Sequence, residues 1–296
     1  MIQSKSRIPH YGGQALIEGV LMRGKENVVA VMRKPDGSLH IEQEKLEGSN
    51  RTRLASMPFI RGLVILWDSL SLGMKYLTAS ANIQAEDEEK IEGGSMVLTV
   101  VVSIFFAIGL FFLVPLLIVE LLTNIIVIPE SWMPFLEGLF RLLILILYMW
   151  AIGQTNEIKR VFAYHGAEHK TINTFENGKE LNIKNISNFP LEHPRCGTSF
   201  LLTLVFISII FFSILGPLPI LWKISSRVLL IPILSMVSYE IIKWMGDHLE
   251  NPFIRLITKP NILLQKLTTR EPTSDMIEVA LISFQTLLKL ENKDIA

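Results

Sequence analysis

The chain has 296 residues, of which 50% are hydrophobic and only 19% are charged. This composition carries more apolar groups and less charge than a water-soluble surface usually does. Lys and Arg (28) balance Asp and Glu (28), so nothing in the overall charge suggests nucleic-acid binding. The single cysteine, Cys196, excludes an intramolecular disulfide and therefore a secreted disulfide scaffold.

The N-terminal segment, residues 1–56, predicts a small β unit over residues 11–48. Two β-prone runs, Val28–Met32 and Ser38–Ile41, flank the turn sequence KPDG. Ahead of them, GGQALIEGVLMRG mixes glycine with apolar residues, which favours a glycine-bent strand that packs closely on a neighbour. A phosphate-cradling loop is the alternative, although neither a Walker pattern nor GxGxxG is present.

Residues 57–94 predict a helix followed by an acidic linker. The run Met57–Leu77 is apolar enough to lie in or on a membrane, but Arg61 and Asp68 interrupt it. We expect an interfacial or re-entrant helix here, with a fifth membrane span as the alternative.

Four stretches approach the roughly 20 apolar residues that cross a bilayer as a helix. They fall in two pairs, within residues 95–153 and 198–246, and cover Ser95–Leu122, Trp132–Gly153, Thr198–Leu215 and Val228–Met245. Glu137 and Arg141, near the start of the second, are four residues apart and can meet on one helix face. Buried helices of a soluble protein are the alternative, but the chain has too little polar surface to cover four of them.

The C-terminal segment, residues 247–296, predicts an amphipathic helix. Thr273 or Ser274 can cap it, with Asp275 in its first turn. Apolar side chains then recur at helical spacing, at Ile277, Ala280, Leu281, Phe284, Leu287 and Leu288. Such a stripe usually packs on the protein's own soluble part, and a partner protein is the alternative.

The distribution of Lys and Arg predicts how the chain crosses the membrane. Twelve of these residues precede the first span, whereas the link between the first and second spans, TNIIVIPESWMP, has none. The loop of residues 154–197 and the C-terminal tail are again basic. By the positive-inside rule, both termini and this middle loop are cytoplasmic. The expected fold is a mainly α, polytopic membrane protein with a small N-terminal β unit and a C-terminal amphipathic helix.

The middle loop carries a group of potential metal ligands. In a helix His165 and His169 lie one above the other, a spacing at which two imidazoles can bind one metal ion. Glu168 lies between them in the H-x-x-E-H order of the inverted zinc-peptidase motif, in which the Glu is the general base. His193 and Cys196 follow with the spacing of a knuckle that grips a metal from a loop.

Three interpretations of this group remain open. A catalytic zinc would have three protein ligands and an open position for water, with Glu168 as base. A structural zinc would be closed by all four groups, which are His165, His169, His193 and Cys196. Without a metal, the histidines would form hydrogen bonds near the membrane surface, and Cys196 would be an inert buried side chain.

A second polar group lies at the cytoplasmic end of the fourth span. Glu240, Lys243 and Asp247 share one helix face, and His248 and Glu250 follow. One of them can complete the metal site or orient a ligand histidine. The alternative is an internal ion pair between Glu240 and Lys243.

Four ordered motifs resemble the YqhQ family of bacterial membrane proteins, and the resemblance covers essentially the whole chain. They are GGQALIEGVLMRG, YHGAEHKTIN, HPRCGTSFLL and LQKLTTREPTSDMIEVA. The resemblance implies a bacterial inner-membrane location and a predicted metal-dependent enzyme, but no substrate. The soluble H-x-x-E-H peptidases resemble this chain over five residues only.

These observations predict a polytopic protein of the bacterial inner membrane with a zinc site at its cytoplasmic face, which hydrolyses a membrane-associated substrate. The alternative is a non-enzymatic scaffold or accessory factor in membrane-protein insertion or assembly. In either case the expected partners are the lipid bilayer and a membrane-associated protein or substrate, and no nucleic acid. A transporter is disfavoured, because the spans carry few charges and show no internal repeat.

Overall fold

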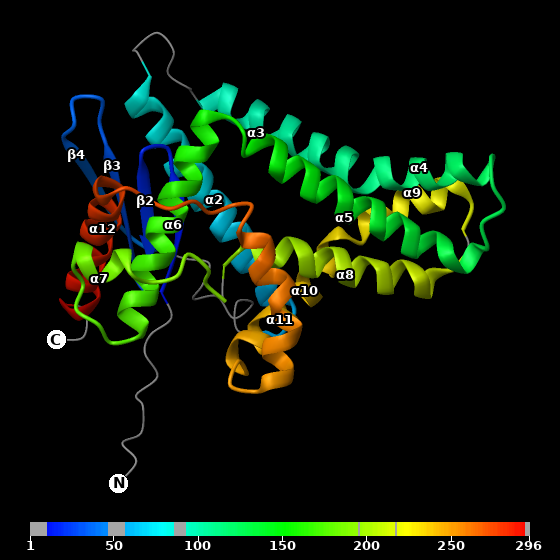
Figure 1. Ribbon diagram of the computed structural model, residues 1–296. Coiled ribbons are helices and arrows are strands. Elements are labelled where there is room, and N and C mark those ends of the chain that lie inside the picture. The colour runs from blue at the N-terminus through cyan, green and yellow to red at the C-terminus, as the bar shows by residue number, and fades with distance from the viewer. Residues whose placement is uncertain (1–10, 47–56, 86–92, 195, 217, 294–296) are drawn as a thin grey trace.

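The computed structural model describes residues 11–46, 57–85, 93–194, 196–216 and 218–293. These residues form a sheet with helices packed on it and, at the other end of the molecule, an elongated group of apolar helices (Figure 1). The predicted mainly helical chain with an N-terminal β unit is confirmed at this level.

The sheet has four antiparallel strands in chain order: β1 (Gly12–Leu16), β2 (Gly19–Arg23), β3 (Asn27–Arg33) and β4 (Leu39–Lys45). The glycine-rich segment predicted as one bent strand is instead the hairpin of β1 and β2, whose registers pair Leu16 with Gly19. Its two-residue turn holds Glu18 at a φ of 52°. The sequence of β2 lacks the alternation of apolar and polar residues that marks a half-exposed strand, because β2 is buried along nearly its whole length. The hairpin is therefore not predicted.

Helices cover both faces of the sheet. On one face, α6 (Asn156–Glu176) and α12 (Ser274–Lys293) pack against Val20, Met22, Val29 and Val31. The other face, which includes Leu21 and Ala30, packs against Tyr76 of α2 (Ile60–Gln84). Strands between two apolar layers read as continuous hydrophobic runs. This explains why β3 does not alternate, whereas the edge strand β4 does.

The C-terminal helix α12 packs on the protein's own sheet, as expected from its apolar stripe. Ile277, Ala280, Phe284 and Leu287 are at most 2% exposed in this interface. The short helix α7 (Ile183–Ser187) joins them through Ile186.

Helix α2 connects the sheet to the apolar helices. Its C-terminal half carries Tyr76 beneath the sheet, and near its N-terminus Arg61 forms an ion pair with Glu240 of α10 (Ile231–Asp247). The alternative Glu240–Lys243 pair is therefore wrong, because the guanidinium of α2 binds Glu240 through two of its nitrogens. Within the described part of the chain, α2 is not among the helices that are long and apolar enough to span a membrane.

Among the residues that the structure describes, three helical segments are long and apolar enough to cross a membrane. The first runs from Gly93 to Thr123 through α3 (Gly93–Ile108), the π-helical turn η3 (Gly109–Leu113) and α4 (Val114–Thr123). The second, Glu130–Ile152, comprises the 3-10 turn η4 (Glu130–Trp132) and α5 (Met133–Ile152). The third is α8 (Thr198–Leu215).

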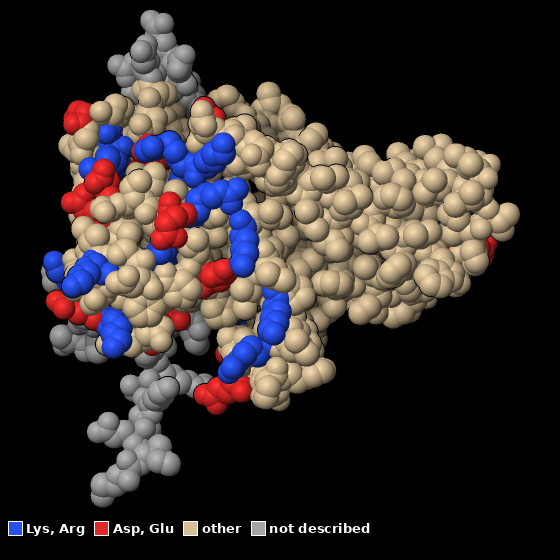
Figure 2. Space-filling model, in the orientation of Figure 1, with Lys and Arg blue, Asp and Glu red and all other residues tan. Residues whose placement is uncertain are grey.

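The fourth predicted span is not one straight helix. The predicted stretch Val228–Met245 comprises the last two residues of α9 (Ile220–Leu229) and most of α10. These two helices meet at an angle of 46° and count as a fourth span only if the bent pair is taken together. Pro232 in the first turn of α10 explains the break, because proline lacks an N–H and disfavours helical geometry in the residue before it. On the face in Figure 2 the elongated group of apolar helices is nearly free of charge, and Lys, Arg, Asp and Glu gather over the sheet end and over α11 (Pro252–Gln265).

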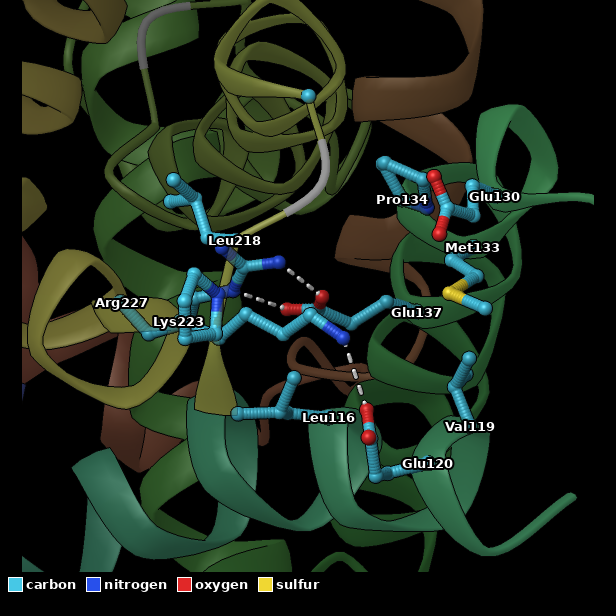
Figure 3. A pocket seen from close by; sticks show the side chains of 12 residues that line it. Leu116, Val119, Glu120, Glu130, Met133, Pro134, Glu137, Leu218, Lys223 and Arg227 are labelled. Carbon is cyan, nitrogen blue, oxygen red and sulfur yellow. Dashed lines mark hydrogen bonds and ion pairs between the residues drawn. The ribbon is translucent and has the colours of Figure 1, made fainter. Parts of the chain in front are cut away.

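A buried triad of charges holds the apolar helices together. Glu137 and Arg141 form the predicted pair on α5 (2.6 Å), and Arg227 of α9 binds the same carboxylate through Nε and Nη2 (3.0 and 2.5 Å; Figure 3). Arg141 also donates to the Phe111 carbonyl (2.7 Å) and to Ser208 Oγ of α8 (2.6 Å). Phe111 lies in η3, where the wider π-helical turn departs from the regular hydrogen-bond ladder.

The charge count of this triad leads to a prediction about stability. Two arginines share one glutamate, so Glu137→Gln leaves two buried cations without a counter-ion, whereas Arg227→Met leaves the Glu137–Arg141 pair intact. Removing one partner of a buried pair costs about 3–5 kcal/mol when a charge is left uncompensated. We expect Glu137→Gln to lower the thermal unfolding midpoint in detergent far more than Arg227→Met. Equal losses, or the reverse order, would contradict a triad held by its carboxylate.

Candidate metal centre

Helix α6 positions three of the predicted site residues. Tyr164, Ala167 and Ile172 pack into the core beneath the sheet, and this packing fixes the rotation of the helix. The adjoining face then carries His165 and His169, whose ring centroids are 4.3 Å apart. The spacing of one helical turn thus brings the two imidazoles together, as the sequence predicts.

Cys196 joins the two histidines from the residues that precede α8. Its Sγ lies 3.4 Å from His165 Nε2, and the ligand atoms of these two residues and His169 all lie within 4.8 Å of one another. We call these three residues the ligand cluster. Nitrogen and sulfur atoms on one tetrahedral zinc lie roughly 3.3–3.6 Å apart, given Zn–N and Zn–S bonds of about 2.0 and 2.3 Å. The cluster therefore fits a metal ion with small side-chain movements.

Backbone carbonyls set the orientation of both imidazoles. His165 Nδ1 lies 2.8 Å from the Thr268 carbonyl, and His169 Nδ1 lies 2.5 Å from the Leu191 carbonyl. A carbonyl only accepts hydrogen bonds, so Nδ1 carries a proton in each ring, and in the neutral imidazole Nε2 then has the free lone pair. Histidine ligands of metals usually donate their other N–H in this way.

His193 lies beside the ligand cluster but is not part of it. Its Nε2 is 3.3 Å from the Glu176 carboxylate, and its ring centroid is 5.7 Å from that of His169. Gln265 clamps the backbone of His193 through both its N–H and its carbonyl (2.9 Å each). The structure thus brings together three of the four predicted ligands. The fourth, His193, faces the carboxylate of Glu176 instead.

Glu168 is buried next to the ligand cluster. Its side chain is 6% exposed, and its Oε2 lies 3.9 Å from His165 Nε2. Burial raises the pKa of Glu168 to about 7, although the nearby His165 acts in the opposite direction. A carboxyl group with such a pKa can both accept and donate a proton near neutral pH.

A small cavity of about 90 Å³ adjoins these residues and offers room for water. Its lining combines the N-terminal strand, α6 and the segment before α8, and consists of Tyr11, Gly12, Gly13, His165, Glu168, His169, Ile172, His193, Cys196 and Gly197. The sequence motifs do not indicate that Tyr11 and Gly13 belong to this site. The glycine pair was the available signal, since a Cβ on Gly13 would lie 2.8 Å from Glu168 Cγ and 2.6 Å from the Leu21 carbonyl oxygen.

Comparisons with known proteins agree with the resemblance in the sequence motifs. Residues 57–290 match a protein family described as "Protein of unknown function (DUF1385)". The chain is 34% identical to the "Uncharacterized protein YqhQ" of Bacillus subtilis (strain 168), over 97% of its own length and 95% of that protein. No solved structure matches it. The chain therefore belongs to the DUF1385 family, together with YqhQ of Bacillus subtilis.

Proposed function

We propose that the chain is a zinc-dependent hydrolase at the cytoplasmic face of the bacterial membrane. The observation that carries this proposal is the orientation of the ligand cluster. Two imidazoles present lone pairs at Nε2 beside a free thiol, and both are fixed from behind by backbone carbonyls. Imidazole and thiolate ligands together favour zinc among the common metals, and a reducing cytoplasm keeps a lone cysteine available.

Three protein ligands distinguish a catalytic zinc site from a closed structural one, because a tetrahedral ion then keeps one position for water or substrate. A zinc ion held by His165, His169 and Cys196 would lower the pKa of a water molecule and polarise the substrate. The cavity lies beside the cluster, and Glu168 lines it. From there the Glu168 carboxylate takes the proton of the attacking water and returns it to the leaving group, as a general base and then a general acid.

Charge and hydropathy support the proposed location. The apolar helices lie at one end of the molecule, and the charged residues gather at the sheet end on the face shown in Figure 2. The ligand cluster lies between α6 and the start of α8, where the chain passes from the charged end to the apolar helices. The positive-inside rule assigns this end to the cytoplasm.

A second candidate function is a scaffold with a structural metal ion. It is favoured by the hydrogen bonds that tie Leu191 and Thr268 to the two histidines, because an ion here would hold three separate segments together. The two functions predict different effects of removing the Glu168 carboxylate. A hydrolase would lose activity, whereas a scaffold would not be affected because it needs no proton-transfer group.

Metal analysis of purified protein tests the ligand assignment. We expect about one zinc per chain in the wild type, and loss of most of it in His169→Ala and Cys196→Ser because three ligands are the minimum for tight binding. His193→Ala should keep its zinc, as should His248→Ala, an exposed control whose Nδ1 is bonded to its own helix. A zinc-free wild type, or zinc lost in His193→Ala but kept in Cys196→Ser, would contradict the assignment.

A second experiment separates the enzyme from the scaffold. We expect zinc-loaded wild type to hydrolyse chromogenic acyl esters, and Glu168→Gln to bind zinc but react roughly 10²–10⁴-fold more slowly, the usual contribution of a general base. Glu176→Gln is the matched control, because that carboxylate faces His193 instead of the ligand cluster. Hydrolysis that Glu168→Gln leaves unchanged would exclude the proposed role of this residue. Zinc-loaded wild type without any activity would favour the scaffold.

A further inference from the structure

A larger groove lies beside the ligand cluster, between the N-terminal half of α2, the start of α8 and the end of α10. Its volume is about 630 Å³, within the range of small-molecule sites. It is lined by Ile65, Leu66, Ser69, Cys196, Gly197, Phe200, Tyr239, Ile242, Lys243, Gly246 and Asp247.

The groove and the cavity share two wall residues, Cys196 and Gly197. Cys196 is a member of the ligand cluster, so a molecule in the groove lies against a metal ligand. A Cβ built on Gly197 would meet no atom within 4 Å, so the space beside this shared residue is open. The groove is therefore positioned as the approach to the proposed zinc ion.

The chemistry of the lining selects an apolar ligand. The lining is mainly apolar and includes Ile65, Leu66, Phe200 and Ile242. Its polar side chains are those of Ser69 on α2 and of Tyr239, Lys243 and Asp247 on α10. On α10 the exposed Lys243 and Asp247 lie one helical turn apart with opposite charges. Because the two charges cancel, this part of the groove does not favour a simple anion or cation. It suits the junction between a hydrocarbon chain and a polar group.

The position of the groove points to the bilayer as the source of this ligand. α8 begins at Thr198 and α10 ends at Asp247, so the groove lies at the ends of two proposed membrane-spanning segments. In the proposed orientation this is the level of the cytoplasmic headgroups, where acyl chains and polar groups meet.

The apolar wall of the groove runs from Ile65 and Leu66 of α2 to Phe200 of α8 and ends at Cys196. A single flexible hydrocarbon chain can follow this wall, and a polar group at its end then lies beside the ligand cluster.

We propose that the groove binds the acyl chain of a membrane lipid or similar amphiphile and presents its polar group to the zinc site. This inference rests on the proposed function and assigns it a substrate class. The substrate enters sideways from the cytoplasmic leaflet, and the bond to be hydrolysed lies near the junction of its chain and its polar group.

Photolabelling of the full-length protein tests the groove directly. The probe is a phosphatidylglycerol with a diazirine in one acyl chain, in vesicles of phosphatidylglycerol and phosphatidylethanolamine. Adducts at Phe200 are compared with adducts at Phe105 of α3, a 72% exposed side chain that serves as the reference for nonspecific lipid contact. We expect more adducts at Phe200 than at Phe105.

Two variants that fill the groove make the test specific. Leu66→Trp and Ile242→Trp should lower the ratio of Phe200 to Phe105 adducts about fivefold, because a filled pocket cannot bury the chain. Their zinc content should remain that of the wild type, which also confirms that they fold. Leu70→Trp, a 57% exposed position on α2 outside the groove lining, is the matched control and should change neither quantity.

The outcomes separate this proposal from the proposed function. A ratio at or below one, or a ratio unchanged in both filling variants, overturns the groove proposal even if zinc is bound. Displacement of the lipid label by an apolar helical peptide would assign the groove to a protein segment and overturn it as well. Zinc-free protein that still labels at Phe200 overturns the metal centre, and with it the role of the lipid as substrate.

Discussion

Neither face of the N-terminal sheet can be left in water, because β2 and β3 carry apolar side chains on both sides. The chain covers them with helices from three distant regions, α2 on one face and α6 and α12 on the other. This double burial determines the rotation of α6, so that the packed Tyr164 and Ala167 direct His165 and His169 toward the start of α8. The ligand cluster is thus a consequence of how the sheet is covered.

Hydrogen bonds and close contacts then fix the orientation of the side chains in the site. Carbonyls of Leu191 and Thr268 orient the imidazoles, and Gln265 holds the backbone of His193. Gly13 lets strand β1 approach the Glu168 side chain more closely than any residue with a Cβ would allow. Residues from the N-terminal, middle and C-terminal segments therefore all contribute to one site. A substitution in any of the three segments can disturb it without changing a ligand.

The sequence predicts features that depend on local patterns and misses those that depend on tertiary contacts. The apolar runs, the i,i+4 pair of Glu137 and Arg141 and the turn between His165 and His169 are local, and the structure contains them. The third member of the charge triad, Arg227, lies 90 residues from Glu137, and no spacing rule connects them. The spacing of His193 from Cys196 is that of a metal knuckle, but the loop conformation turns its ring to Glu176. Sequence spacing gives the order of ligands in a loop and not their directions.

We propose a zinc ion held by two histidines and one cysteine, with one position left open. X-ray absorption at the zinc edge of the purified full-length protein tests this coordination most directly. We expect one sulfur at about 2.3 Å, two imidazoles and one further light atom at about 2.0 Å. A third imidazole in place of the light atom would indicate a closed structural site that includes His193. No zinc-bound sulfur at all would contradict the assignment of Cys196 and the metal centre proposed here.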